Sequence, residues 1–217
     1  MWDIEIHRGT AAQFHAREMP ADIQPAVWWF EVRSPALVIG SAQPAAHVDE
    51  AACTARGIEV VRRRSGGGAV LLEPGDALWI DVLLPATDPR WTADVSRSAW
   101  WLGEVWRDAL GDIGEDDLVV HRGPMVRTQW SDRVCFAGIG GGEVVRAGAK
   151  VVGISQRRTR SGARFQCAVH RHWRPESHLP LFAPPGPTLD DLAGRVHAID
   201  VDPSTVMTAF LAALRAA

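Results

Sequence analysis

The chain has 217 residues, of which 47% are hydrophobic and 23% are charged, and its formal net charge is −3. This length suits one large domain or two small ones, and the composition is typical of a globular protein with a hydrophobic core. This slightly negative net charge argues against a nucleic-acid binder that is basic over its whole surface. The arginines that are present fall into local clusters.

Strand patterns outnumber helix patterns along the chain. Alternating or continuous β-type runs predict strands at residues 2–7, 26–32, 36–41, 58–62, 69–72, 77–84, 144–145, 150–155 and 165–170. Helical spacing predicts helices at residues 10–18, 48–56, 94–110 and 204–215. Gly57 is expected to end the second helix, Asp94 to cap the third, and Pro203 to open the fourth. The proline-rich stretch 180–187 is predicted to be a loop.

No internal repeat or interdomain linker interrupts this pattern. Helices scattered among many strands predict a single α+β or mixed-sheet domain. The three cysteines, Cys53, Cys135 and Cys167, show no CxxC spacing, so neither a disulfide framework nor a zinc site is predicted. The N-terminus lacks the features of a signal peptide, and no run of about 18 apolar residues predicts a membrane span. The expected location is the cytoplasm, with reduced thiols.

One segment carries most of the chemical information. Arg62, Arg63 and Arg64 lead into Ser65 and three consecutive glycines at 66–68. Consecutive glycines leave backbone N–H groups open to a phosphate or carboxylate, and neighbouring arginines supply positive charge. The segment therefore predicts a cradle for an anionic ligand. A glycine-rich hairpin with solvated arginines is the alternative.

A second segment places a lysine at the start of an apolar strand. Lys150 lies in the run Gly-Ala-Lys-Val-Val-Gly at residues 148–153. A poorly solvated cation at such a position is easily aimed at a bound anion. An edge-strand lysine that prevents aggregation is the alternative. Arg157, Arg158 and Arg160 follow closely, and they predict either a solvated turn or a docking patch for an acidic partner.

Other familiar binding motifs are absent. Gly138 and Gly140 lack the third glycine of a dinucleotide-binding loop, and no P-loop sequence occurs. His170, His172 and His178 have no carboxylate or cysteine in a fitting pattern, so no metal site is predicted. The arginine clusters lack interleaved aromatic residues, which argues against a nucleic-acid partner.

Together, the two segments resemble the catalytic domain of the lipoate-protein ligase family, which is related to the biotin-protein ligases. The family's Arg-Arg-x-Ser-Gly-Gly-Gly-Ala-Val segment matches residues 62–70, and its Gly-x-Lys-x-x-Gly segment matches residues 148–153, in the same order and at a similar separation. The resemblance covers roughly residues 35–169. It implies one biotin/lipoate ligase-like domain over residues 1–217, with a mixed, largely antiparallel β-sheet and packed helices, and without the C-terminal accessory domain of some members.

The resemblance also implies an activity. The family joins lipoate or octanoate to ATP, usually with Mg²⁺, to give an acyl-adenylate and pyrophosphate. The acyl group then passes to a lysine on the lipoyl domain of an oxoacid dehydrogenase E2 or on a glycine cleavage H-type protein. By position, Lys150 would bridge the acyl carboxylate and the α-phosphate, offsetting the repulsion between the two anions. The residues that would hold the nucleotide and the acyl-adenylate are Arg63, Ser65, Gly66, Gly67, Gly68, Ala69, Val70, Leu71 and Lys150.

The acyl chain of such a substrate needs a dry tunnel. Aromatic and aliphatic residues in the neighbouring predicted strands are candidates for its walls, with a role in the core as the alternative. These candidates are Trp28, Trp29, Val38, Ile39 and Trp79.

The chain departs from the ligase pattern at three places. Residues 71–73, Leu-Leu-Glu, stand where the family has an aromatic residue followed by His-Asp. The lysine segment is not preceded by the family's Asn-Asp pair. Residues 166–168, Gln-Cys-Ala, replace a His-Gly-Thr strand. All three departures remove polar groups, so they bear on the use of ATP more than on the fold.

These departures keep two other hypotheses open beside the leading one, an ATP-dependent ligase. Cysteine-dependent octanoyltransferases are a related branch that uses no ATP and takes octanoyl from acyl carrier protein. One such group has Cys-Phe fifteen residues before the lysine, and Cys135-Phe136 stand at that distance from Lys150. Cys135 would then be the nucleophile, since a nearby cation favours the reactive thiolate. A buried, inert Cys135 is the alternative, and a non-catalytic acyl- or nucleotide-binding homologue is the third hypothesis.

Overall fold

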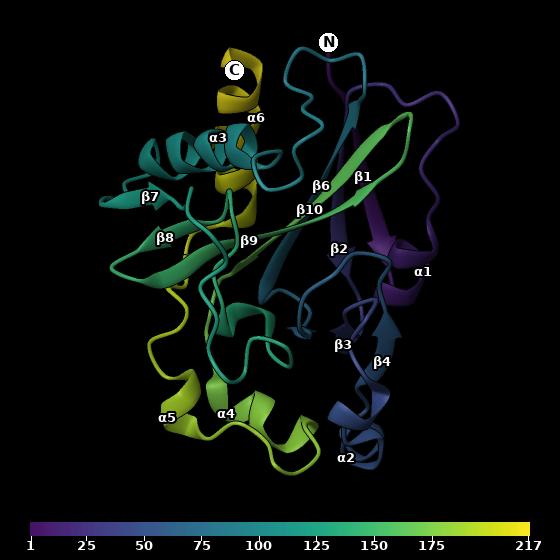
Figure 1. Ribbon diagram of the computed structural model, residues 1–217, viewed down its shortest axis with the longest axis vertical. Coiled ribbons are helices and arrows are strands. Elements are labelled where there is room, and N and C mark those ends of the chain that lie inside the picture. The colour runs from purple at the N-terminus through teal and green to yellow at the C-terminus, as the bar shows by residue number, and fades with distance from the viewer.

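The computed structural model describes residues 1–217, which form two β-sheets. The larger sheet has seven strands in the order β1-β2-β6-β10-β9-β8-β7 (Figure 1). Only β1 and β2 are parallel neighbours, and every other adjacent pair is antiparallel, so the expected mixed, largely antiparallel sheet is confirmed. Its strands are β1 (Asp3–Gly9), β2 (Ala26–Val32), β6 (Ala77–Pro85), β7 (Leu118–Val120), β8 (Val144–Arg146), β9 (Ala149–Arg158) and β10 (Gly162–His170).

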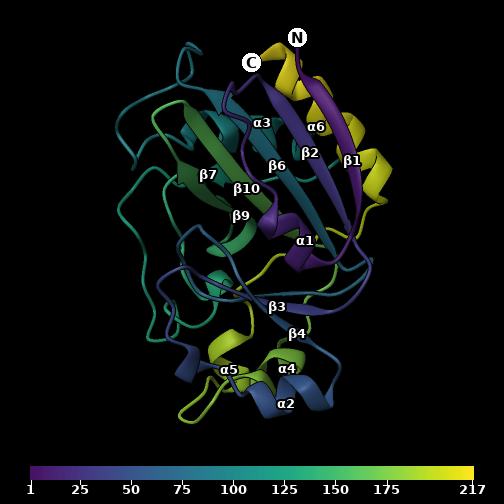
Figure 2. The same cartoon turned by 90° about the vertical axis from the view of Figure 1, so that its right-hand side faces the viewer.

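The smaller sheet has three strands in the order β4-β3-β5, and it lies below the larger sheet in Figure 2. Its strands are β3 (Ala36–Ile39), β4 (Glu59–Arg62) and β5 (Val70–Leu72). The central strand β3 runs parallel to β4 and antiparallel to β5. The glycine-rich segment therefore connects the two outer strands and must cross the end of β3.

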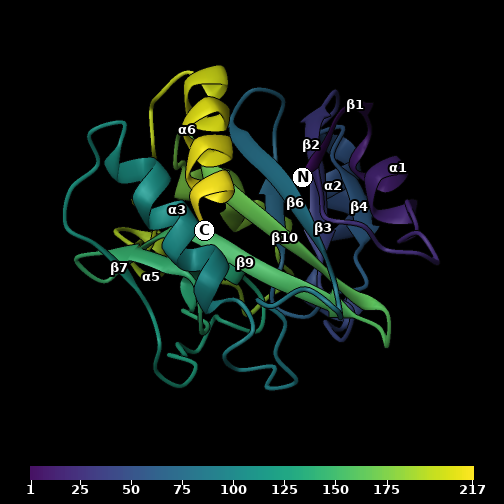
Figure 3. The same ribbon diagram turned by 90° about the horizontal axis from the view of Figure 1, so that it is seen from above.

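Two long helices cover one face of the larger sheet, as Figure 3 shows. They are α3 (Trp100–Gly111) and α6 (Pro203–Ala216), and each buries an apolar stripe against the strands. Trp106 of α3 packs on Phe210 of α6 with ring centroids 4.4 Å apart. Burying large aromatic side chains is a major source of stability, so this face holds the main core of the domain.

The opposite face of the larger sheet carries α1 (Ala11–Ala16) and the smaller sheet. A capping box formed by Thr10 and Gln13 begins α1. The remaining short helices lie around the smaller sheet (Figures 1 and 2). They are α2 (Glu50–Ala55), α4 (Pro175–His178), α5 (Leu189–Leu192) and the 3₁₀ turns η1 (Ala45–His47), η2 (Cys135–Ala137) and η3 (Leu179–Leu181).

The start of α3 differs most from the position expected from the sequence. A helix was expected from residue 94, but α3 begins at Trp100. Asp94 caps no helix, because its carboxylate accepts hydrogen bonds from the backbone N–H and the hydroxyl of Ser96 within the preceding turn. Val95, inside the expected helix, is exposed. The short elements β7, α4, α5 and the 3₁₀ turns were not predicted, because they are only three or four residues long and show no clear periodicity.

Candidate active site

The glycine loop between β4 and β5 is folded against two other backbone segments. A Cβ atom at Gly40, which follows β3, would lie 1.8 Å from the carbonyl oxygen of Gly67, so the loop crosses β3 where no side chain can fit. Gly67 has a φ of +97°, a conformation that favours glycine. A Cβ at Gly68 would lie 2.8 Å from backbone atoms of Val134 and Cys135. The motif therefore needs glycine for close approach as well as for backbone shape.

Arg63 holds this loop from inside. It is buried, and its guanidinium donates hydrogen bonds to the carbonyl oxygens of Gly66, Gly68 and Val38 at 2.8–3.2 Å. The N–H groups of the three glycines, in contrast, donate to no acceptor in the protein. The loop thus directs carbonyls inward to an arginine and leaves N–H groups available for an anionic oxygen.

The glycine loop is hydrogen-bonded to the segment that contains Cys135. The N–H of Ala69 donates to the carbonyl of Arg133 at 2.7 Å, and the N–H of Cys135 donates to the carbonyl of Ala69 at 2.9 Å. The Sγ atom of Cys135 also lies 3.8 Å from where a Cβ at Gly67 would be. The glycine loop and the segment before η2 therefore meet at Cys135.

Lys150 lies behind Cys135 in a buried position. Its ammonium donates a hydrogen bond of 2.8 Å to the Cys135 carbonyl and lies 5.2 Å from the centroid of the Phe136 ring. A Cβ at Gly153 would come within 3.2 Å of that ring. The Gly-x-Lys-x-x-Gly segment thus provides both the cation and the space that seat Phe136 beside it.

Glu143 is the counter-ion of Lys150 and was not identified from the sequence. Its Oε2 atom is 2.8 Å from the Lys150 ammonium, and both side chains are almost completely buried. Oε2 also accepts a hydrogen bond from the N–H of Gly140 at 2.6 Å, and Oε1 accepts one from Ile154 at 3.1 Å. A buried charge is tolerated when it is paired and hydrogen-bonded in this way. The positive charge of Lys150 is therefore already balanced by the Glu143 carboxylate inside the protein.

A pocket of about 430 Å³, including its opening to solvent, lies between the two sheets. Cys135 and Phe136 line the pocket beside apolar residues of the smaller sheet, Val38, Val70 and Leu72. The larger sheet contributes Trp79, residues 153–155 of β9 and residues 166–168 of β10. Most of the lining is apolar, so the pocket suits a hydrocarbon chain with the Cys135 thiol on its wall.

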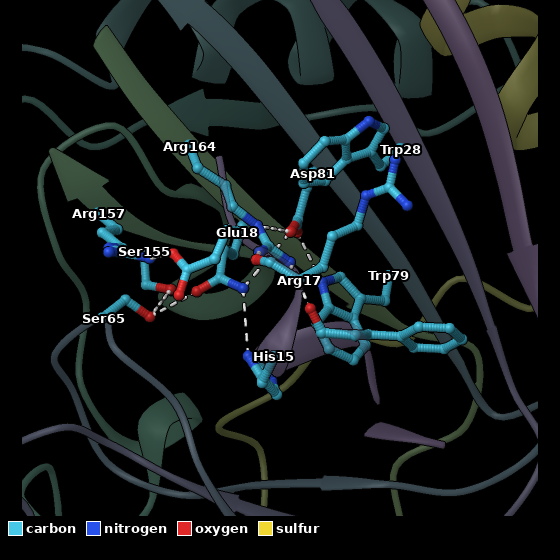
Figure 4. A network of polar contacts seen from close by, with 12 residues as sticks. His15, Arg17, Glu18, Trp28, Ser65, Trp79, Asp81, Ser155, Arg157 and Arg164 are labelled. Atoms are coloured by element: carbon cyan, nitrogen blue, oxygen red, sulfur yellow. Dashed lines mark hydrogen bonds and ion pairs between the residues drawn. The ribbon is translucent and has the colours of Figure 1, made fainter. Parts of the chain in front are cut away.

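Three polar side chains, His15, Ser155 and Gln166, also line this pocket. Ser65 ties two of them to the glycine loop, since its hydroxyl donates to Gln166 Oε1 at 2.7 Å and shares a hydrogen bond of 3.0 Å with Ser155 (Figure 4). Burial, aided by the nearby charges of Arg164 and Arg63, lowers the pKa of His15 to about 3. His15 is therefore a neutral hydrogen-bonding group at physiological pH.

A buried ion pair fixes α1 beside this polar group. Arg164 Nε and Asp81 Oδ2 are 2.5 Å apart, and the indole N–H of Trp79 donates to the same carboxylate at 2.6 Å (Figure 4). Arg164 also donates to the carbonyl oxygens of Phe14 and Arg17 at the end of α1. The position of His15 is thus set by contacts between α1 and the larger sheet.

The residues expected at the site have different places in the structure. Cys135, Arg63 and Val70 line the pocket, as do two of the tunnel candidates, Val38 and Trp79. Lys150 does not line it. The lining does not include Trp28, Trp29, Ile39, Ser65, Gly66, Gly67, Gly68, Ala69 and Leu71.

Two further observations bear on cofactors and membranes. No group of three or more His, Cys, Asp and Glu side chains is arranged to hold a metal ion. No helix of this chain combines the length and the apolar character needed to cross a bilayer.

The chain matches one protein family over most of its length. Residues 11–172 match the family described as the lipoyl protein ligase A/B catalytic domain. No curated protein sequence matches the chain significantly.

Solved structures described as lipoate protein ligases, one of them as a putative one, share this fold. The chain is similar to protein Ta0514 from T. acidophilum with bound lipoic acid, with a TM-score of 0.75, 16% identity, and coverage of 99% of this chain and 84% of that one. Lipoate-protein ligase A bound with ATP has a TM-score of 0.74 with the same identity and coverage. A bipartite lipoate protein ligase from Thermoplasma acidophilum, described with its E2 lipoyl domain, has a TM-score of 0.75 at 16% identity, covering 99% of this chain and 82% of that one. The expected biotin/lipoate ligase-like fold is confirmed.

Proposed function

This chain belongs to the lipoyl protein ligase A/B catalytic domain family, and we propose that it transfers an octanoyl or lipoyl group to a lysine of a lipoyl-domain protein through a thioester on Cys135. The acceptor would be an oxoacid dehydrogenase E2 or a glycine cleavage H-type protein. The family membership supports the acyl group and the acceptor. The position of Cys135 supports the route.

The observation that carries the proposal is the place of the Cys135 thiol. Cys135 lines an apolar pocket, and its Sγ atom lies beside the glycine loop, whose N–H groups have no acceptor in the protein. An acyl chain in the pocket would bring its carbonyl carbon to the thiol, and a negatively charged carbonyl oxygen would find N–H donors nearby. A nucleophile, an apolar site for the chain and donors for the carbonyl oxygen are three of the parts that nucleophilic acyl transfer uses.

The proposed acyl transfer has two steps. In the first, the Cys135 thiol loses its proton and attacks the carbonyl carbon of an acyl thioester on a carrier protein. The bond from that carbon to the carrier sulfur breaks, and the sulfur takes up a proton and leaves as the free carrier thiol. In the second, the amine of the acceptor lysine attacks the Cys135 thioester, forming an amide, losing a proton and releasing the Cys135 thiol. Lys150 acts as a positioning residue, because its ammonium holds the carbonyl of Cys135.

The same geometry gives weaker support to the ATP-dependent route. Lys150, expected to bridge carboxylate and phosphate, is already paired with Glu143 and does not line the pocket. Arg63, expected to hold the nucleotide, directs its guanidinium to three backbone carbonyls. These residues do not fit a triphosphate with Mg²⁺ as they are arranged. Activation with ATP remains a prediction that rests on the family resemblance.

Mass spectrometry separates the two routes. After incubation with octanoyl-acyl carrier protein and no ATP, the wild-type protein should carry one octanoyl adduct on Cys135. Cys135→Ala should lose the adduct and the transfer to a lipoyl domain, falling by about 10²-fold or more because the nucleophile is gone. Cys53→Ala is the matched control, since this cysteine also has a free thiol but is buried and does not line the pocket.

Two results would overturn the proposal. One is full transfer activity in Cys135→Ala. The other is pyrophosphate exchange that depends on octanoate or lipoate, in a protein that never acquires the adduct. The second result would establish the ATP-dependent ligase instead.

A further inference from the structure

A single carboxylate bridges two arginines near the pocket. Glu18, two residues beyond α1, forms an ion pair with Arg64 of the glycine loop, and its other oxygen lies 3.1 Å from Arg157 Nη1 of β9. Hydrogen bonds from Arg64, and then from Arg157, hold the pKa of Glu18 below its usual range, so the bridge is ionised at neutral pH. Three segments far apart in the sequence thus meet at one exposed ion triad.

The triad adjoins the polar side chains of the pocket. Arg64 precedes Ser65, whose hydroxyl contacts Ser155 and Gln166. Arg157 and Ser155 are two residues apart in β9, so they share a face of the sheet. Figure 4 shows Glu18 and Arg157 beside Ser155 and Ser65. A molecule bound to the two arginines would therefore lie next to the acyl site.

The triad is accessible, unlike the other ion pairs of the site. The side chains of Glu18, Arg64 and Arg157 are 59%, 46% and 28% exposed, whereas Lys150–Glu143 and Arg164–Asp81 are buried. Exposed ion pairs are weak because water screens both charges. A carboxylate from another molecule can therefore replace Glu18 at little cost.

We propose that Arg64 and Arg157 form a docking site for the acidic surface of the carrier protein that delivers the acyl group, and that Glu18 occupies this site in the free enzyme. The inference rests on the proposed function, because it assumes a protein-borne acyl donor. A partner carboxylate would make the same two contacts that Glu18 makes now. Glu18 is then an internal competitor that sets how tightly an acidic partner binds.

The test uses octanoyl-acyl carrier protein as the donor. Arg64→Ala/Arg157→Ala should raise the KM for this donor about tenfold, since interface charges govern association, with kcat little changed. Its KM should also depend less on salt than that of the wild type. Glu18→Gln should lower the KM severalfold by removing the competitor. Arg107→Ala is the matched control, because Arg107 is a similarly exposed arginine paired with carboxylates on α3.

A neutral small donor, octanoyl-N-acetylcysteamine, separates docking from chemistry. All four proteins should load Cys135 from this thioester at similar rates, because it has no acidic surface. Binding of the carrier protein to each variant in a Cys135→Ala background, measured by calorimetry, reads the docking site even if no acyl transfer occurs. An unchanged affinity in Arg64→Ala/Arg157→Ala would overturn the docking proposal, whereas absent loading from the neutral donor would count against the Cys135 route alone.

Discussion

The contacts of Lys150 indicate a structural role for this residue and not direct binding of a ligand. Its charge is paired with Glu143 and its remaining contacts are the Cys135 carbonyl and the Phe136 ring. A lysine aimed at a ligand would have an unpaired ammonium facing the pocket. In this chain the lysine instead stabilises the backbone that presents the thiol.

The buried pair leads to a prediction about stability. Lys150→Met leaves the Glu143 carboxylate buried without a counter-ion, and Glu143→Gln leaves the Lys150 ammonium in the same state. Each single change should lower the free energy of unfolding by about 3–5 kcal/mol. Chemical denaturation with urea measures both values.

The double variant tests whether the two residues act as a pair. Because it buries no unpaired charge, its loss of stability should be smaller than the sum of the single losses, by about 0.5–3 kcal/mol. Losses that add within experimental error would show that the two charges do not interact. Cys135 loading should fall in all three variants, since each disturbs the group that holds the Cys135 carbonyl.

At the scale of elements, the site depends on a loop that joins two outer strands across a central one. β3 lies between β4 and β5, so the glycine loop passes over the end of β3 and then contacts the segment before η2. The contact with this segment is at Gly68, where the backbone of residues 134–135 leaves no room for a side chain.

Two neighbouring glycines therefore respond differently to the same substitution. Gly68→Ala places a methyl group 2.8 Å from backbone atoms, and this overpacking should cost about 1–3 kcal/mol and displace Cys135. Gly66→Ala meets no atom within 4 Å, and Gly66 has no positive φ, so its stability should stay close to that of the wild type. Thermal unfolding of both variants checks the contrast. Equal melting temperatures would contradict the packing argument.

Local patterns predicted most of the elements and both motif segments. The continuous apolar runs and the proline that begins α6, Pro203, act within a few residues, so they can be found in one sequence. Glu143 could not be found in this way, because its role comes from hydrogen bonds made across β8 and β9. His15 likewise reaches the pocket only because Arg164, 149 positions later, holds α1 against the larger sheet.

At the scale of the whole molecule, the two faces of the larger sheet have different roles. One face carries α3, α6 and the main core, and the other carries the smaller sheet, α1 and the pocket. Three histidines on the pocket side are shielded from solvent, and two of them, His170 and His178, are buried. His15 lines the pocket, while His170 and His178 both pack on Trp173, and the ring centroids of His170 and Phe136 are 4.5 Å apart.

These histidines predict acid sensitivity of the whole fold. Burial lowers the pKa to about 3 for His15 and His170 and to about 4 for His178, below the ordinary value of 6.5. Between pH 6.5 and the lowered pKa values, the unfolded chain binds protons at these histidines and the folded chain does not. The free energy of unfolding must therefore fall as pH falls through this range. Each histidine contributes a slope of up to about 1.4 kcal/mol per pH unit, with full stability above pH 6.5.

Urea denaturation at several values between pH 4 and pH 7 measures this slope. His170→Leu should lower the number of protons taken up on unfolding by about one, and the slope with it. The reason is that the variant has one imidazole fewer whose protonation differs between the folded and unfolded states. This substitution also removes a ring nitrogen, Nε2, that has no hydrogen-bond partner in the fold, so stability near pH 5 should lie closer to that at pH 7 than in the wild type. A slope that stays the same in His170→Leu would mean that His170 is protonated in the folded protein, and that the aromatic packing around Phe136 tolerates a charge.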